Sequence, residues 1–219
     1  MTFKETMAWL KKNGTTQNIK VYQRHGAGKN VFGVSFANLN NLVKKIKVDH
    51  NLALSLWKTG NTEAQTLALK IINPEIFTKT LANQWIKQIS YRVLAGELAE
   101  LVSKTSFASE KMEQWMRSPK EFYRYCGYSI MCLLLKENKF ISKNCIQYIS
   151  TIEKEIHSSP NLSRYAMNMA LTAIGIYALE KEAIKAAKKI GKVEVDHGET
   201  GCKTPDAETY IKKALARRR

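Results

Sequence analysis

A short motif occurs twice in this chain. Ser118-Pro119 returns as Ser159-Pro160, 41 residues later, and Arg124-Tyr125 returns as Arg164-Tyr165, 40 residues later. Each copy leads into an apolar stretch with the spacing of a buried helix. Repetition at this period, in a sequence whose patterns are helical, indicates stacked pairs of antiparallel helices.

These signals predict an all-α fold, a HEAT-like or armadillo-like helical-repeat solenoid in which antiparallel helix pairs form a crescent. The one alternating segment that suggests a strand is 192–196. The helix predicted over 162–188 has an alternative reading as two helices joined near 177–179. We expect one repeat domain over residues 1–190 and, packed on it, a C-terminal loop and basic helix over residues 191–219. The helices are expected near 39–46, 61–72, 80–90, 93–104, 109–117, 120–136, 142–158, 162–188 and 204–216.

Charge indicates the kind of partner. Lys and Arg number 35 against 19 Asp and Glu, a net charge of +16, so the ligand of the concave face is expected to be a polyanion. The longest apolar run, Tyr128–Leu135, is too short to cross a bilayer, and residues 1–5 lack the layout of a signal peptide. Four cysteines without paired spacing favour reduced thiols. We therefore expect a cytoplasmic monomer, associated with the nucleoid when bound to DNA, and no membrane partner.

Motifs for nucleotides and metals are incomplete. Residues 26–30 resemble the end of a phosphate-binding loop, but Gln23 and Asn30 replace its first Gly and its hydroxyl residue, so no nucleotide is expected. His197, Glu199 and Cys202 lie close in sequence without a matching second cluster, and no metal or other cofactor is expected. The last helix is expected to begin with Thr204 as its N-cap and Pro205 as its first residue.

Basic and aromatic residues at equivalent repeat positions are the best candidates for DNA contact. Arg binds phosphate, and Tyr stacks on a base or donates to phosphate. Lysines of the segment 185–192 exceed the neighbouring acids, which favours phosphate contact over a merely solvated face. The candidates from these two patterns are Arg124, Tyr125, Arg164, Tyr165, Lys185, Lys188, Lys189 and Lys192.

A family resemblance adds to these patterns. Tyr22-Gln23-Arg24-His25-Gly26 and Phe32-Gly33-Val34-Ser35-Phe36, leading into a helix at Leu39, resemble the DNA alkylation repair family of HEAT-like repeat alkylpurine DNA glycosylases. The resemblance covers roughly residues 5–190, and the segment 194–206 is similar to one subgroup. It implies duplex DNA held in the concave groove, and excision of N3- and N7-alkylated purines without a metal and without full base flipping.

The family's catalytic pattern is only partly present. The family uses a Trp and, four residues later, an Asp that stabilises the cationic sugar; here Tyr91 or Arg92 takes the Trp position and Ala95 or Gly96 the Asp position. Glu97 is the nearest carboxylate, one or two residues late and so turned about 100–200° around a helix. The family's middle Arg falls at Tyr125, beside Arg124, and a later Trp and Arg pair falls at Met169 and Thr172. Tyr22 matches the N-terminal Tyr.

The sequence therefore predicts a DNA-binding protein of this family with weak or lost glycosylase activity. One alternative is an active alkylpurine glycosylase that uses Glu97 or another carboxylate, and a second is a protein-interaction scaffold, because solenoids commonly serve that purpose. The sequence does not discriminate between intact, damaged and branched duplexes as the preferred DNA. The residues predicted to bind DNA are Tyr22, Arg24, Tyr91, Arg92, Arg124, Tyr125, Arg164, Lys185, Lys188 and Lys189.

Overall fold

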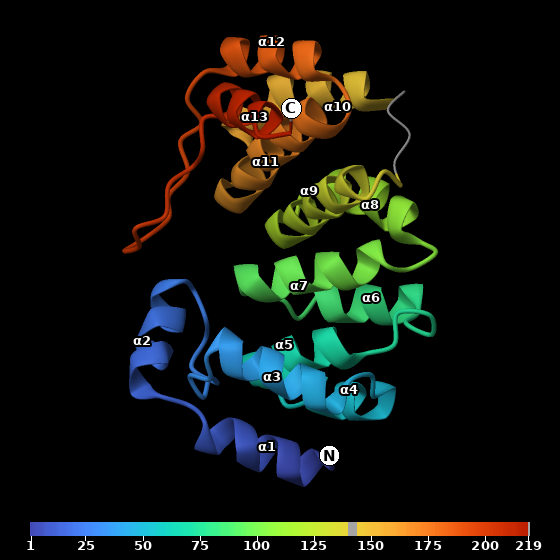
Figure 1. The fold of residues 1–219 in the computed structure, drawn as a ribbon, viewed down its shortest axis with the longest axis vertical. Helices are drawn as coiled ribbons and strands as arrows, with labels where there is room; N and C mark the ends of the chain where they lie inside the picture. The colour runs from blue at the N-terminus through green and yellow to red at the C-terminus, as the bar shows by residue number, and fades with distance from the viewer. Residues whose placement is uncertain (140–143, 219) are drawn as a thin grey trace. The chain divides into compact units, whose positions relative to one another are not determined.

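Helices and the segments that join them make up residues 1–139 and 144–218, the part of the chain that this computed structural model describes (Figure 1). The all-α prediction is confirmed. Within those residues β pairing is limited to an isolated bridge between Gly14 and Val34. The helices are α1 (Phe3–Lys12), α2 (Thr16–Arg24), α3 (Phe36–Ile46), α4 (His50–Trp57), α5 (Thr62–Ile71), α6 (Lys79–Ile86), α7 (Arg92–Ser103), α8 (Ala108–Met116), α9 (Glu121–Lys136), α10 (Cys145–Glu155), α11 (Asn161–Tyr177), α12 (Glu180–Ile190) and α13 (Ala207–Ala216), with a 3₁₀ turn, η2 (Ile156–Ser158).

Local sequence explains most helix starts. Asn61 caps α5 as expected, because its side-chain oxygen accepts a hydrogen bond from the backbone N–H of Ala64 at 3.0 Å. The predicted start of the last helix was wrong: α13 begins at Ala207, and its N-cap is Asp206, whose carboxylate accepts from the backbone N–H of Thr209. A carboxylate at the N-cap also interacts favourably with the helix dipole. Thr204 instead lies 3.0 Å from a ring nitrogen of His197.

Two of the sequence alternatives are decided by the backbone. The stretch predicted over 162–188 is two helices, α11 and α12, separated at Ala178 and Leu179, so the second reading is confirmed. The segment 192–196 forms no strand. Its Asp196 is bound at both backbone groups by the side-chain amide of Asn161, at 2.7 and 2.8 Å. The beginning of the helix predicted over 142–158 includes residues outside the described ones.

The chain divides into two compact units. The first comprises Met1–Ser106 with Gly198–Thr200, and the second begins at Phe107 and includes α8 to α13. The expected grouping of residues 1–190 as one domain stays a prediction, as does the assignment of 191–219 as an addition to it. Among the described residues, no helix has both the length and the apolar character needed to cross a bilayer.

The first unit is built around α5, whose residues are almost all buried against α3, α4 and α7. The indole rings of Trp57 and Trp85 stack in this core with centroids 4.0 Å apart. The buried carboxylate of Glu63, on α5, accepts hydrogen bonds from the backbone N–H groups of Phe32, Gly33 and Val34 at 3.0, 2.5 and 3.1 Å. These bonds hold the glycine-bearing loop that precedes α3 against the core.

The second unit is built around α9 and α11. Helix α9 packs on α8 and on α11, and α11 also contacts α10, α12 and α13. Gly127 permits the close approach of α8 and α9, because a Cβ there would lie 2.5 Å from the backbone nitrogen of Met116. The two copies of the sequence repeat thus correspond to the successive helix pairs α8/α9 and α10/α11.

Candidate nucleic-acid interface

Arg124 and Arg164 occupy equivalent positions in the two repeats. Each is the fourth residue of its helix, α9 or α11, and each backbone N–H donates to the carbonyl of the capping residue, Lys120 or Pro160, at 3.1 and 2.8 Å. The starts of the two helices are also joined directly, because a carboxylate oxygen of Glu121 accepts from the backbone N–H of Leu162 at 2.6 Å. The sequence repeat therefore predicted a true structural equivalence.

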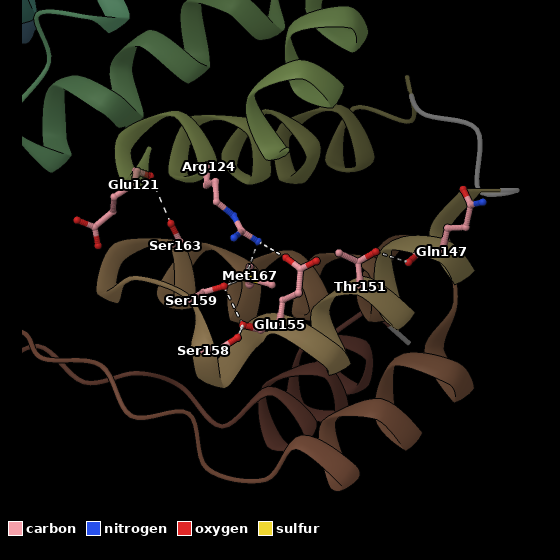
Figure 2. A network of polar contacts seen from close by, with 9 residues as sticks. All are labelled: Glu121, Arg124, Gln147, Thr151, Glu155, Ser158, Ser159, Ser163 and Met167. Atoms are coloured by element: carbon pink, nitrogen blue, oxygen red, sulfur yellow. Dashed lines mark hydrogen bonds and ion pairs between the residues drawn. The ribbon is translucent and has the colours of Figure 1, made fainter. Parts of the chain in front are cut away.

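Arg124 is mostly buried by the next helix pair. Figure 2 shows its guanidinium turned toward Glu155 and Met167, with the nearest carboxylate oxygen of Glu155 at 2.6 Å and the sulfur of Met167 at 3.8 Å. The arginine side chain is 14% exposed. Its positive charge and hydrogen bond to the hydroxyl of Tyr128 oppose the effect of burial, which raises the pKa of that tyrosine. Arg124 therefore has a structural role here, and its DNA contact stays a prediction.

Arg164 holds the segment between α12 and α13. Its guanidinium donates to the backbone carbonyls of Glu194, at 2.8 Å, and Ser159, at 3.3 Å. Asn161 binds Asp196, one turn earlier, and the amide of Asn168 donates to the carbonyl of Pro205 at 2.9 Å, one turn later. Positions 161, 164 and 168 lie on one face of a helix. This face of α11 anchors both ends of the segment 194–205, and phosphate contact by Arg164 stays a prediction.

The three tyrosines predicted to contact DNA are buried in this structure. The hydroxyl of Tyr22 donates to the backbone carbonyl of Val34 at 2.6 Å, and its ring packs on Phe36. Burial, and then the nearby charge of Glu63, raise the pKa of Tyr22 to about 12. Tyr91 precedes α7 and is 4% exposed, and Tyr125 is 9% exposed. These tyrosines contribute to packing, and base stacking by them stays a prediction.

The predicted cations differ in how much of their charge is already neutralised. Arg24 is exposed at the end of α2, where Gln17, Lys20 and Gln23 line an open hollow with it. Arg92, at the start of α7, is partly buried. On α12, the ammonium groups of Lys188 and Lys189 lie 3.7 and 2.6 Å from the carboxylates of Glu208 and Glu153. Lys185 is exposed on the same helix.

Glu97, the weak catalytic candidate, is engaged in an ion pair. Its carboxylate lies 2.7 Å from the ammonium of Lys70, and both side chains are largely buried. They lie at a cavity of about 390 Å³ between α3, α5 and α7. Burial raises the pKa of Glu97, and the hydrogen bond and charge of Lys70 act in the opposite direction. The two residues at the position where the family carries its Asp differ in burial: Ala95 is completely buried in the core and Gly96 is half-buried.

A cavity of about 490 Å³ is lined by residues 191–195, 197 and 202–207 together with Asn168 of α11. Its lining includes His197, Thr204 and the thiol-bearing Cys202. The imidazole of His197 also meets the ring of Tyr165 edge-on, with centroids 5.8 Å apart. In the described part of the chain, no group of three or more His, Cys, Asp or Glu side chains is placed to hold a metal ion.

The sequence patterns do not identify one large set of cations as candidates for DNA contact. Within the first 58 residues those patterns predict DNA contact for Tyr22 and Arg24 alone, although this stretch holds nine further Lys residues. A simple signal was present: its carboxylates are only Glu5 and Asp49, and both stand at positions typical of helix caps.

Comparisons with known proteins agree with the resemblance. The family described as DNA alkylation repair enzyme matches residues 6–215. Uncharacterized proteins of Listeria innocua and Listeria monocytogenes are each 29% identical over 227 aligned positions, which cover 99% of this chain and 99% of each relative.

A solved structure is similar over the whole chain, with a TM-score of 0.91 and 30% identity, covering 100% of this chain and 96% of the other. That protein is described as one of a new family related to the HEAT-like repeat DNA glycosylases, with affinity for branched DNA structures. The HEAT-like repeat prediction is therefore confirmed.

Proposed function

Because the chain belongs to the DNA alkylation repair enzyme family, we propose that it is a DNA-binding protein which holds duplex DNA through phosphate contacts and has lost most or all glycosylase activity. The observation that carries this proposal is its large excess of positive charge, +16 over 219 residues, on a fold related to DNA glycosylases. Lys and Arg that neutralise phosphates release condensed counterions, which drives binding without reading sequence.

Branched DNA is the preferred ligand in this proposal. The similar solved protein has affinity for branched DNA structures, and its likeness to this chain extends over the full length. A junction brings several phosphate backbones close together and so offers a higher local density of negative charge than a linear duplex. A protein that relies on phosphate contacts gains from that density.

The loss of glycosylase activity rests on the surroundings of α7. Excision of an alkylated purine builds positive charge on the sugar, and a fixed carboxylate stabilises it. Ala95 and Gly96 carry no charge, and Glu97 lies about 100–200° further around the helix, paired with Lys70. A carboxylate already neutralised by an ammonium group offers little stabilisation to a second cation.

Binding to labelled DNA over a salt series tests the proposal. Linear duplex, three-way and four-way junctions of equal length are compared between about 50 and 200 mM salt. We expect tighter binding to the junctions and a log–log slope of about −0.9 for each phosphate neutralised. The DNA-binding function would be overturned by an affinity that does not change with salt concentration. It would also be overturned by the absence of binding at about 50 mM salt with tens of micromolar protein. Equal affinity for the three DNAs would overturn the preference for branches.

A further inference from the structure

Positive charge is unevenly distributed within the first unit. Residues 1–58 contain ten Lys or Arg and two carboxylates, whereas residues 59–106 contain five and four. The ten cations, called here the N-terminal cationic set, come from α1 to α4 and their connections. They are Lys4, Lys11, Lys12, Lys20, Arg24, Lys29, Lys44, Lys45, Lys47 and Lys58.

Both carboxylates of this stretch bind helix ends. Glu5 closes a capping box at the start of α1, where its side chain accepts from the backbone N–H of Thr2 at 2.8 Å. That backbone hydrogen bond is the main reason that the pKa of Glu5 is lowered, and the charge of Lys45 adds a smaller effect. Asp49 accepts from the backbone N–H of Leu52 at 2.9 Å and caps α4. The carboxylates of Glu5 and Asp49 therefore bind backbone N–H groups at helix starts.

The N-terminal cationic set is exposed and without ion pairs. All ten side chains are exposed, and among the described residues none of them lies within salt-bridge distance of a carboxylate. Three lysines at the end of α12 differ, because Lys188, Lys189 and Lys192 each lie beside a glutamate. A lysine beside a carboxylate gives up that attraction when it binds a phosphate, whereas an unpaired lysine gives up only water and mobile anions.

We infer that the surface of α1 to α4 is the main phosphate-binding surface of this protein, and that the paired lysines of α12 contribute little. The inference rests on the proposed function and adds to it a location within the chain. It differs from the sequence prediction, which includes Lys188 and Lys189 among the DNA contacts and, of the N-terminal cationic set, only Arg24. The ligand chemistry is that of a sugar–phosphate backbone, which requires several separated cations and no base-specific pocket.

Matched charge-removal variants of the 219-residue chain test this location. The first two are Lys11→Gln with Lys12→Gln, and Lys20→Gln with Lys29→Gln; the control is Lys188→Gln with Lys189→Gln, which removes the same charge. Affinity for a four-way junction and for linear duplex is measured over the same salt series. Circular dichroism and urea unfolding establish that each variant is folded.

We expect each N-terminal double variant to reduce the salt slope by about 1–2 and to weaken binding on the order of tenfold per lost contact at about 0.1 M salt. The control is expected to change affinity less than about threefold. A control that loses as much slope as the N-terminal variants, or N-terminal variants that bind as the unmodified protein does, would overturn the location while leaving DNA binding intact. If the unmodified protein binds neither DNA, the proposed function itself fails, and the location fails with it.

Discussion

The guanidinium of Arg124 and the carboxylate of Glu155 lie 2.6 Å apart, although 31 positions separate them in the sequence. The contact joins α9 to the end of α10 and so ties one helix pair to the next. Figure 2 shows this contact within a network of polar contacts, and it uses a residue that the sequence patterns assigned to DNA. The first prediction concerns this pair.

Replacing Arg124 with Met should lower the free energy of unfolding by about 1–2 kcal/mol, because it leaves Glu155, which is about half exposed, without its partner. Urea unfolding measures the effect. Arg117→Met is the matched control, since Arg117 pairs with Glu113 on the exposed surface of α8, where an ion pair is worth about 0–1 kcal/mol. Equal losses of unfolding free energy in the two variants would show that the Arg124–Glu155 pair stabilises the fold no more than an exposed ion pair does.

Glu63→Gln should destabilise the first unit by about 2 kcal/mol. An amide keeps one oxygen acceptor and brings an N–H₂ group against the three backbone N–H groups of residues 32–34, so that buried donors lose their partners. The midpoint of urea unfolding reports the loss, and the exposed Glu75→Gln serves as control with an expected change below about 0.5 kcal/mol. A midpoint that does not move in Glu63→Gln would contradict the role given to this carboxylate.

Glu97 should make stability fall as pH rises above its ordinary pKa of 4.5. Burial raises the pKa of Glu97, so the folded state holds this proton more tightly than the unfolded chain does. Between the unfolded and the folded pKa, the folded protein therefore loses stability with increasing pH. Glu97→Gln lacks this titration. We expect the unfolding free energy of the unmodified protein minus that of the variant to decrease from about pH 4.5 upward, and an increase would mean that the ion pair with Lys70 outweighs burial.

Release of 7-methylguanine or 3-methyladenine should stay close to the uncatalysed rate in single-turnover assays. Loss of one well-placed electrostatic group costs on the order of 100- to 1000-fold in rate, and the position where the family carries Asp holds Ala95 or Gly96. Rapid release that Glu97→Gln abolishes would make Glu97 the missing carboxylate and would favour the active-glycosylase alternative. Rapid release that persists in the variant would place the active site elsewhere in the chain.

The equivalence of α9 and α11 was predictable from sequence because a repeated motif fixes local positions. Arg124 and Arg164 do stand at the same helical position. What each guanidinium binds was not predictable, because Glu155 and Glu194 are some 30 residues away and come close only through helix packing. Local rules also gave the wrong cap for α13, since both Thr204 and Asp206 suit an N-cap and only the backbone decides between them.

The candidate site was less predictable than the fold for a related reason. The sequence does not distinguish a lysine that pairs with a carboxylate of another helix from a lysine that has no such partner. Lys188 and Lys189 stood out because they cluster, yet Glu208 and Glu153 lie next to them in space. The lysines of α1 to α4 are spread over a longer stretch of sequence, in short groups such as Lys11-Lys12 and Lys44-Lys45, and in the described structure none of them forms an ion pair.

The ten unneutralised charges of the first 58 residues also repel one another in the absence of DNA. That repulsion opposes compaction of the free protein, and dissolved ions screen it over about 10 Å at 0.1 M ionic strength. Added salt should therefore make the fold more resistant to denaturant, and under the proposed function it also weakens the complex with DNA. In that complex the polyanion would neutralise the charges that dissolved ions otherwise screen, so the ligand would stabilise the protein most at low ionic strength.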